Sequence, residues 1–168
     1  AGPVRLLARF ASGPGAVEAQ VASAARLVGG QPLAGDDERA CWRAQVEAPW
    51  IAPGLVARLA WLPSDLEAVL DRLTAISGHH GLGVRFTGRA AVGAGFVTLE
   101  GQPSALIAAL TALRADPLLA HVVVLRAEAP VKTAVTVWGA ASGAPGPLRA
   151  LKDYFDPAGM LNPGRGPV

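Results

Sequence analysis

Hydrophobic positions along the chain recur in three similar stretches, each with an apolar run, a proline-containing turn and a helical stripe. Apolar residues at every second position predict a strand, whereas a spacing of three or four predicts one face of a helix. In the first stretch, alternating residues 6–10 precede a turn at Pro14 and a helix that ends at Gly29. The apolar stripe of this predicted helix consists of Val17, Val21, Ala24 and Val28.

The second and third stretches follow the same plan, with predicted strands at Val56–Trp61 and Phe96–Leu99. Ser64 and Glu67 have the spacing of a capping box, in which each side chain accepts a hydrogen bond from a backbone N–H that the first helical turn leaves unpaired. The helices should end near Gly78 and Pro117. Their stripes consist of Leu66, Val69, Leu70, Leu73 and Ile76 in the second stretch, and Leu106, Leu110 and Leu113 in the third.

Three further strands are predicted between the helices, at Cys41–Ala48, Gly83–Thr87 and Val122–Leu125. Residues 55–127 therefore have the order β-α-β-β-α-β of a ferredoxin-like sandwich. Residues 1–48 add a β-α-β unit in front. Because each helical stripe must be buried against something, the pattern predicts an α+β fold in which helices cover one face of an antiparallel or mixed sheet.

After the sixth predicted strand the pattern becomes less regular. Residues 131–138 form one more alternating segment, a flexible turn follows, and residues 148–155 form a short helix that is stopped by Pro157. The chain then reads DPAGMLNPGRGPV, which is rich in proline and glycine but includes Met160 and Leu161. We expect Ala158–Leu161 to be an ordered tail, packed onto the domain by these apolar side chains.

Composition narrows the possible classes of protein. The 168 residues suit one domain, and the single cysteine, Cys41, excludes an internal disulfide and is interpreted as a small buried residue rather than a reactive thiol. The net charge is only +2 and the arginines are scattered, which argues against nucleic-acid binding. No apolar run approaches the roughly 20 residues needed to cross a bilayer, so no direct membrane insertion is expected.

Two motifs invite a functional interpretation that their context does not support. The pair His79-His80 has no third ligand at metal spacing, so we interpret it as part of a solvated loop rather than a metal site or general base. The glycines of residues 88–95 lack the spacing of a dinucleotide-binding fingerprint and predict a hairpin loop.

Charged and aromatic residues offer no catalytic set either. The acidic run at residues 36–38 is interpreted as a solvated loop rather than a cation site. Arg126 and Lys132 are interpreted as ordinary strand-end charges, with an anion cradle as the alternative. The tryptophans are expected in the core or beneath a neighbouring surface. We therefore predict no catalytic residue and no metal ligand in this chain.

The C-terminal string VWGAASGAPGPLRALKDYFDPAGMLNPGR resembles the C-terminal signature of FAD-linked oxidases of the vanillyl-alcohol-oxidase type. The likeness is closest to the FAD-binding subunit of bacterial glycolate oxidase (glycolate dehydrogenase), which works beside a separate catalytic subunit. The segments HVVVLRAEAPVKTAVTVWG and RLLARFASGPGAVEAQVASAARL are also similar to that FAD-binding subunit, so the resemblance covers essentially the whole chain.

The resemblance implies that residues 1–168 are a single cap domain. FAD would be held mainly by an N-terminal domain of the PCMH type, whose Gly-rich pyrophosphate loop is absent from this chain. The implied cofactor-binding residues are Asn162, Pro163, Gly164 and Arg165. Asn162 would lie near the isoalloxazine, Pro163 and Gly164 would shape the turn, and Arg165 would lie near the interface with the FAD domain.

The resemblance also carries implications for activity and partners. Catalytic branches of the family have a His-x-Gly-Asp-Gly-Asn segment for metal and substrate, whereas this chain reads GHHGLGVRF, so no substrate metal site is expected. The implied partners are the FAD-binding domain, a separate catalytic flavin subunit and an iron–sulfur subunit. The implied location is cytoplasmic, or peripheral to the inner membrane through those subunits.

The implied function is to help oxidise a small 2-hydroxy acid as part of a flavoprotein, with the isolated chain inactive. The alternative is a free-standing ferredoxin-like module that binds a small molecule or mediates oligomerisation without catalysis.

Overall fold

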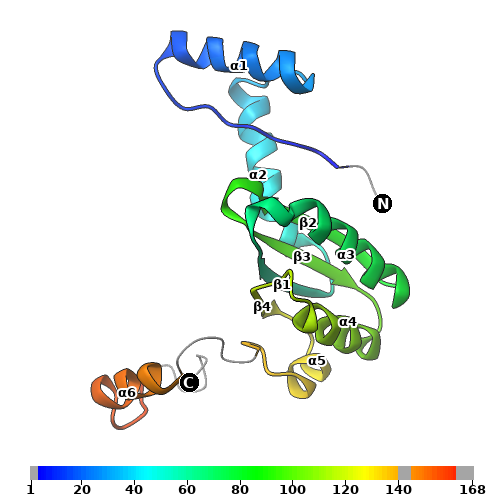
Figure 1. The fold of residues 1–168 in the computed structure, drawn as a ribbon, viewed down its shortest axis with the longest axis vertical. Helices are drawn as coiled ribbons and strands as arrows, with labels where there is room; N and C mark the ends of the chain where they lie inside the picture. The colour runs from blue at the N-terminus through cyan, green and yellow to red at the C-terminus, as the bar shows by residue number, and fades with distance from the viewer. Residues whose placement is uncertain (1–3, 140–144, 162–168) are drawn as a thin grey trace. The chain divides into compact units, whose positions relative to one another are not determined.

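A computed structural model of the chain describes residues 4–139 and 145–161. The chain divides into two compact units, Ala1–Val46 and Glu47–Val168. Helices and an antiparallel sheet occur together, which confirms the predicted α+β class (Figure 1). The single cap domain stays a prediction.

Among the described residues of the first unit, the regular secondary structure is all helical. It contains α1 (Pro14–Val28) and the beginning of α2 (Gly35–Ile51). The helix predicted after Pro14 is thus confirmed, but residues 6–10 form no strand, and Cys41–Ala48 is helical rather than a strand. The predicted N-terminal β-α-β unit is therefore wrong. The acidic residues 36–38 form the first turn of α2, where negative charge favours the helix through its dipole, and not a loop.

The second unit contains a four-stranded sheet with the order β2-β3-β1-β4, in which every neighbouring pair is antiparallel. All four strands predicted for residues 55–127 are confirmed, as are the two helices between them. Their bounds are β1 (Leu55–Ala60), α3 (Leu66–His79), β2 (Gly83–Arg89), β3 (Ala94–Glu100), α4 (Pro103–Ala115) and β4 (His121–Arg126).

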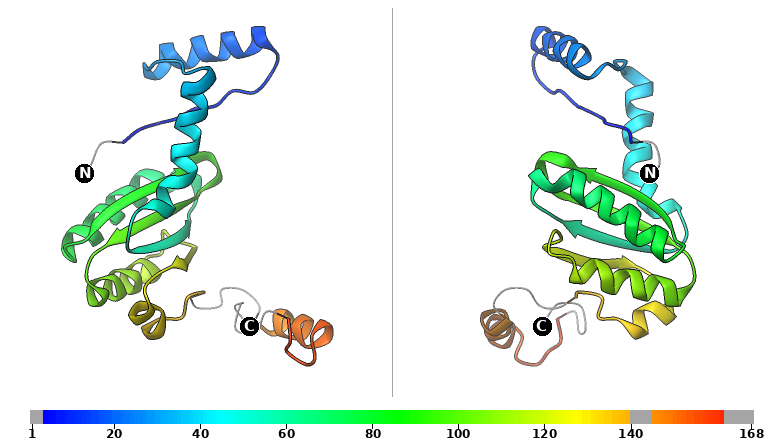
Figure 2. Two further views of the ribbon diagram at one scale, coloured as in Figure 1. Left: turned by 180° about the vertical axis from the view of Figure 1, so that it is seen from behind. Right: turned by 45° about the vertical axis from the view of Figure 1, so that its right-hand side comes forward.

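The core lies between one face of this sheet and the helices α3 and α4, which run side by side across it (Figure 2). Alternate residues of the strands point into it, as the period of two requires. The core residues from the strands are Leu55, Ala57, Leu59, Val97, Leu99, Val122 and Val124; those from the helices are Val69, Leu73, Leu106, Ala109, Leu110 and Leu113.

Two short 3-10 turns shape the connections of the sheet. The first, η1 (Pro63–Asp65), precedes α3, and Ser64 donates its hydroxyl to Asp65 instead of capping a backbone N–H, so the predicted capping box is wrong. The second, η2 (Ala90–Val92), joins β2 to β3, so the predicted hairpin connection is confirmed. It is shorter than the predicted residues 88–95, because Gly88 and Arg89 belong to β2 and pair with Gly95 and Ala94 of β3.

The chain after β4 departs from the prediction of an alternating strand. Residues Ala129–Ala134 form helix α5. Pro130 favours the start of this helix because it lies in the first turn, where the backbone N–H that proline lacks would have no partner within the helix. The backbone then becomes extended, and the carbonyl of Val137 accepts a hydrogen bond from the N–H of Val124 in β4, at 2.8 Å. Arg114 also donates to Val137, at 3.2 Å, and thereby holds this segment beside the sheet.

Candidate functional site

The residues that the resemblance assigns to FAD binding, Asn162, Pro163, Gly164 and Arg165, lie outside the described residues. Their approach is described, because α6 (Pro145–Phe155) and the loop that follows it lead directly to residue 162. The helix confirms the prediction for residues 148–155.

A buried carboxylate organises this loop. Asp156 is only 8% exposed and accepts hydrogen bonds from the backbone N–H groups of Met160, at 2.8 Å, and Leu161, at 2.9 Å. Its other partner is the ammonium group of Lys152, one helical turn earlier. Lys152 also donates to the carbonyl of Leu161, at 2.8 Å, so one charge pair holds both backbone groups of that residue. We call Lys152, Asp156 and the backbone of residues 160–161 the loop clamp.

The loop clamp explains the residues of the DPxGxL string in physical terms. Gly159 has a φ of 64°, a left-handed conformation that glycine adopts without steric cost, and its N–H bonds to the carbonyl of Asp156. Pro157 ends the helix because it has no N–H to continue the ladder. The hydrogen bond from Lys152 lowers the pKa of Asp156, and the two backbone donors lower it further, so the carboxylate stays charged at neutral pH.

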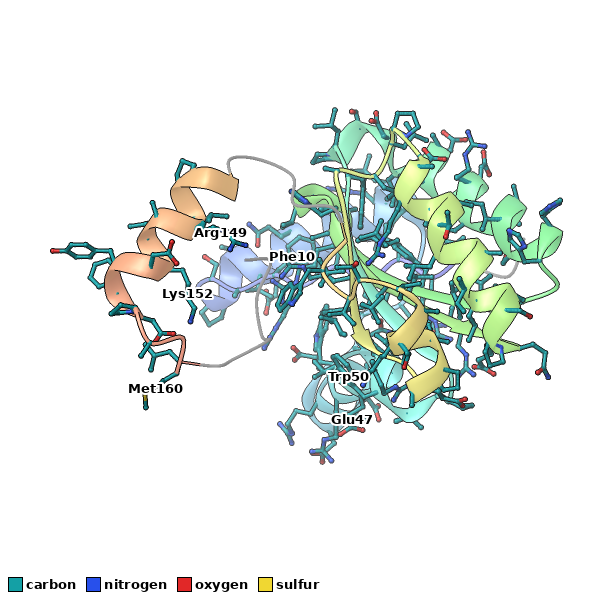
Figure 3. All side chains as sticks on the ribbon, turned by 90° about the horizontal axis from the view of Figure 1, so that it is seen from below. Phe10, Glu47, Trp50, Arg149, Lys152 and Met160 are labelled. Carbon is teal, nitrogen blue, oxygen red and sulfur yellow. The ribbon has the colours of Figure 1, made fainter. Side chains whose placement is uncertain are left out.

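Met160 and Leu161 do not pack onto the domain, which contradicts the expectation that their side chains hold the tail in place. They are 77% and 62% exposed, and Met160 points away from α6 in Figure 3. Polar bonds to Asp156, and not apolar contacts, determine the conformation of this loop. The two apolar side chains are thus available to another surface.

The second candidate region is the face of the sheet opposite α3 and α4, which we call the uncovered face. The register places Thr87, Phe96, Arg58 and Val123 in one row across its four strands. Arg58 lies on an inner strand, is exposed, and forms no ion pair or hydrogen bond with any described residue. Among the described acidic residues of the strands, only Glu100 belongs to this face, and it already pairs with Arg85.

The last turn of α2 covers one end of this face. The ring of Trp50 lies 5.8 Å from that of Phe96, and Figure 3 marks Trp50 on this turn beside Glu47. Arg126 donates to the carbonyls of Trp50 and Ala52, which fixes the connection between α2 and β1. The guanidinium of Arg126 is therefore occupied by backbone carbonyls, which argues against its use in an anion cradle with Lys132.

The other sequence candidates are not brought together into a site. His79 ends α3 and His80 follows as its cap, with their rings edge to face at 4.8 Å. In the described ranges, no three His, Cys, Asp or Glu side chains are arranged to hold a metal ion. Cys41 is half-buried rather than buried. Trp61 alone of the four tryptophans is fully buried, since Trp42 is half-buried and Trp50 and Trp138 are exposed.

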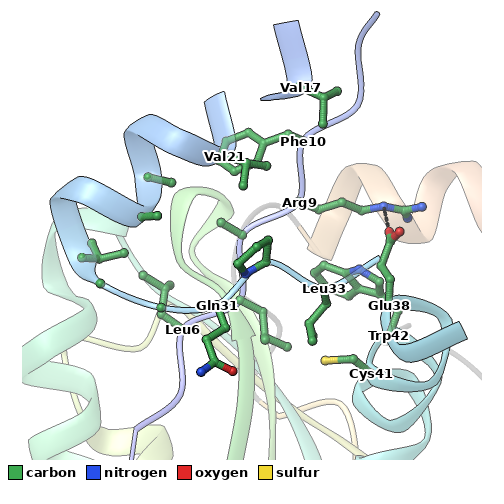
Figure 4. Close-up of a pocket in the computed structure, with 18 residues that line it drawn as sticks. Leu6, Arg9, Phe10, Val17, Val21, Gln31, Leu33, Glu38, Cys41 and Trp42 are labelled. Carbon is green, nitrogen blue, oxygen red and sulfur yellow. Dashed lines mark ion pairs between the residues drawn. The ribbon is translucent and has the colours of Figure 1, made fainter. Parts of the chain in front are cut away.

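A cavity of about 260 Å³ lies within the first unit (Figure 4). Its walls are mostly apolar, including Phe10 and Val21, and at its rim Arg9 pairs with Glu38 at 3.4 Å and lies over the ring of Trp42. No residue in the described part of this unit is buried, so the cavity is a shallow gap in loose packing and presents no convergent polar groups.

No family model, curated protein or solved structure matches the chain. No helix in the described ranges is long and apolar enough to cross a membrane.

Proposed function

We propose that this chain is the C-terminal cap domain of a flavoprotein subunit of a 2-hydroxy-acid oxidase or dehydrogenase of the glycolate type. In this proposal FAD is held mainly by an N-terminal domain of a longer protein, and the cap helps to enclose it. The resemblance of the tail motivates the proposal. The loop clamp is the observation that supports the proposal best, because it explains how Lys152 and Asp156 of the resembling string hold the backbone of residues 160–161.

The clamp matters because it holds the backbone that leads into Asn162. A residue that contacts a cofactor must be positioned to within a fraction of an ångström by its surroundings. Three hydrogen bonds to the carboxylate of Asp156 supply such positioning without using Met160 or Leu161 side chains. Those two side chains then remain for contact with the FAD-binding domain.

The described residues are compatible with a cap role. The uncovered face presents Phe96 and Trp50 beside Arg58, a combination of aromatic and cationic groups that suits contact with a planar, anionic cofactor or its substrate. When bound, FAD would supply the redox chemistry by accepting hydride from the substrate. The role of this chain is to exclude water and to orient groups around the flavin. Asn162, Pro163, Gly164 and Arg165 would provide its direct contacts to FAD.

The test compares two substitutions in the longer protein, purified with its flavin. Asp156→Asn removes the charge of the loop clamp, whereas Asp153→Asn removes an exposed acid from the same helix and serves as the control. We expect Asp156→Asn to lower the FAD content per mole of protein, with the far-UV circular dichroism unchanged, and Asp153→Asn to retain full flavin. Equal flavin content in both variants would contradict the role of the clamp.

A second candidate function is a free-standing ferredoxin-like binding module. The observation that favours it is the uncovered face itself, since such a surface serves a ligand or a second copy equally well. The two functions differ in what the isolated chain does with FAD. A cap domain alone should leave the fluorescence of added FAD unchanged, and stoichiometric quenching by this chain alone would refute the view that it is only a cap.

A further inference from the structure

We propose that β2, the outer strand of the sheet, pairs with the β2 strand of a second copy of this chain. The two four-stranded sheets then form one antiparallel sheet of eight strands around a twofold axis. This axis passes through Phe86, so that residue 86 of one copy lies opposite residue 86 of the other. The proposal does not depend on FAD, because every group it uses lies at the β2 edge of the second unit.

The two edges of the sheet differ in how their backbone groups are satisfied. At the β4 edge, the N–H of Val124 donates to the carbonyl of Val137, so the chain itself covers part of that edge. At the β2 edge, no described residue outside β3 hydrogen-bonds to the backbone of residues 83–88 (Figure 1). β2 has seven residues, contains no proline and pairs with β3 without a bulge. A regular edge of this kind is a template for another strand.

On the face that carries α3 and α4, the register through Phe86 is self-complementary. Val84 is 36% exposed although it lies on the core side of the sheet, opposite Leu99 of β3. In the dimer Val84 lies opposite Gly88 of the second copy. The ring of Phe86 lies over its own Gly88, because a Cβ added to this glycine would be 2.6 Å from Cζ of the ring. Val84 of each copy therefore packs against the Phe86 ring of the other, an aromatic pair with a β-branched residue.

On the uncovered face, the same register brings opposite charges together. Glu100 of β3 lies opposite Gly83 and pairs with Arg85, whereas Arg89 forms no ion pair with any described residue. In the dimer Arg89 of the second copy lies on the other side of Gly83. The backbones of Arg89 and Glu100 are then two strand spacings apart, about 10 Å, with no side chain between them. Their long side chains meet over the glycine, once on each side of the axis.

The arginines of β2 also determine which register two copies can adopt. With the axis at Phe86, Arg85 lies opposite Thr87 and Arg89 lies opposite Gly83, so no like charges face each other. With the axis at residue 85, Arg85 would lie opposite itself. With the axis at residue 87, Arg85 would lie opposite Arg89. Like charges directly opposite each other destabilise a strand pair, so the register through Phe86 is favoured over both neighbouring ones.

Analytical ultracentrifugation of the 168-residue chain measures this association. We expect a species of twice the chain mass of 17.1 kDa, with a Kd on the order of 10 μM, as suits a small interface. Val84→Lys should raise the Kd at least about tenfold, because it buries a charge against the Phe86 ring. Leu125→Lys is the matched control on the opposite edge strand, where the side chain is 43% exposed, and should change the Kd less than about threefold.

A second pair of variants tests the charges. Arg89→Glu should raise the Kd about fivefold or more, because it places two acids on either side of Gly83. Arg58→Glu makes the same change in charge on an inner strand of the same face and should alter the Kd less than about twofold. The difference between the two variants should shrink in about 1 M NaCl, where the Debye length is about 3 Å. Far-UV circular dichroism of each variant is the control for folding.

Disulfide formation tests the register itself. Arg85→Cys and Thr87→Cys are made in separate chains, each with Cys41→Ser. Residues 85 and 87 of different copies lie directly opposite, with Cα atoms about 4.5–5.5 Å apart, which a disulfide can bridge. Two copies of residue 85 lie on a diagonal of about 7–8 Å, which a disulfide does not bridge without backbone movement. We expect a cross-linked dimer when the two chains are mixed and oxidised, and little from either chain alone.

The proposal is overturned if the chain sediments as a monomer at about 1 mM. It is also overturned if Val84→Lys and Leu125→Lys have equal effects, since another surface would then hold the dimer. A cross-link that forms as readily from one chain alone as from the mixture would refute the register. These outcomes are distinct from a failure of the cap function, which concerns FAD and the loop clamp.

Discussion

The turn between β2 and β3 requires glycine at position 93, so a substitution there should destabilise the fold. This residue has a φ of 65°, and a Cβ added to it would lie 2.1 Å from the carbonyl oxygen of Trp61. Gly81, in the connection from α3 to β2, has nearly the same φ of 64° but nothing within 4 Å of its Cβ position. The pair Gly93→Ala and Gly81→Ala therefore shares the backbone strain and differs only in the steric clash.

The expected loss in the free energy of unfolding has two contributions, the backbone strain and the steric clash. An alanine in the left-handed region costs about 1–2 kcal/mol, which applies to both variants. Real Cβ atoms essentially never approach another atom closer than 3.0 Å, so in Gly93→Ala the strand or the turn must move. That movement disrupts the hydrogen bond from the N–H of Trp61 to the carbonyl of Gly93, now 2.8 Å long, at a cost of about 1–3 kcal/mol. The total for Gly93→Ala is about 2–5 kcal/mol.

Urea unfolding followed by tryptophan fluorescence measures the difference. With a slope of about 2 kcal/mol per molar urea, an extra 2 kcal/mol lowers the midpoint of Gly93→Ala by about 1 M relative to Gly81→Ala. Equal midpoints for the two variants would refute the argument that the close approach of Trp61 requires glycine at position 93.

Two further predictions concern charged groups with defined partners. Because the pKa of Asp156 is lowered in the folded protein, its carboxylate stabilises the loop clamp above the unfolded pKa of about 3.9, and this stabilisation is lost as pH falls through the lower folded value. The amide signal of Met160 should therefore hold its position from pH 7 to about pH 4 and move only below it, and a shift near pH 6 would contradict the clamp. Burial lowers the pKa of Arg114 from its ordinary value, and the guanidinium of this residue donates hydrogen bonds to the carbonyls of Val122 and Val137. Arg114→Ala should cost about 1–2 kcal/mol and speed hydrogen exchange of the Val124 amide, whereas unchanged exchange would show that the segment after α5 is held by other contacts.

The sheet and its two covering helices were predictable because their residues obey simple periods. In β1, Leu55, Ala57 and Leu59 alternate into the core, and in α4 Leu106, Leu110 and Leu113 fall on one stripe. Local pattern and tertiary packing agree for these elements, so each strand and helix could be predicted from its own segment.

The wrong predictions fall where the outcome depends on contacts that a local pattern does not contain. Residues 6–10 alternate like a strand, but pairing requires a partner, and the described residues offer none. Residues 41–48 fit either period, and the acidic first turn of α2, which favours the helix, has the composition of a solvated loop. Pro130 likewise lies in the first turn of a helix, although the alternating valines that follow it predict a strand.

Only part of each candidate site could be predicted from the sequence. The apolar residues Met160 and Leu161 mark the tail as unusual, yet the group that orders it is Asp156, whose burial no hydrophobic pattern reveals. A usable signal was present, since Lys152 lies four residues before Asp156, the spacing of a side-chain ion pair on a helix. The row that contains Arg58 depends on strand register, which becomes known only when the sheet is formed.

The central claim is that this chain is a cap domain that meets FAD only together with a second domain. The most direct test is the visible absorption spectrum of two purified proteins, this chain alone and the product of its complete gene, after both have been incubated with FAD and desalted. The account predicts that the gene product retains one FAD per chain, with the flavin band in its spectrum, and that residues 1–168 alone retain none. A gene product without flavin, or stoichiometric FAD on this chain alone, would contradict it.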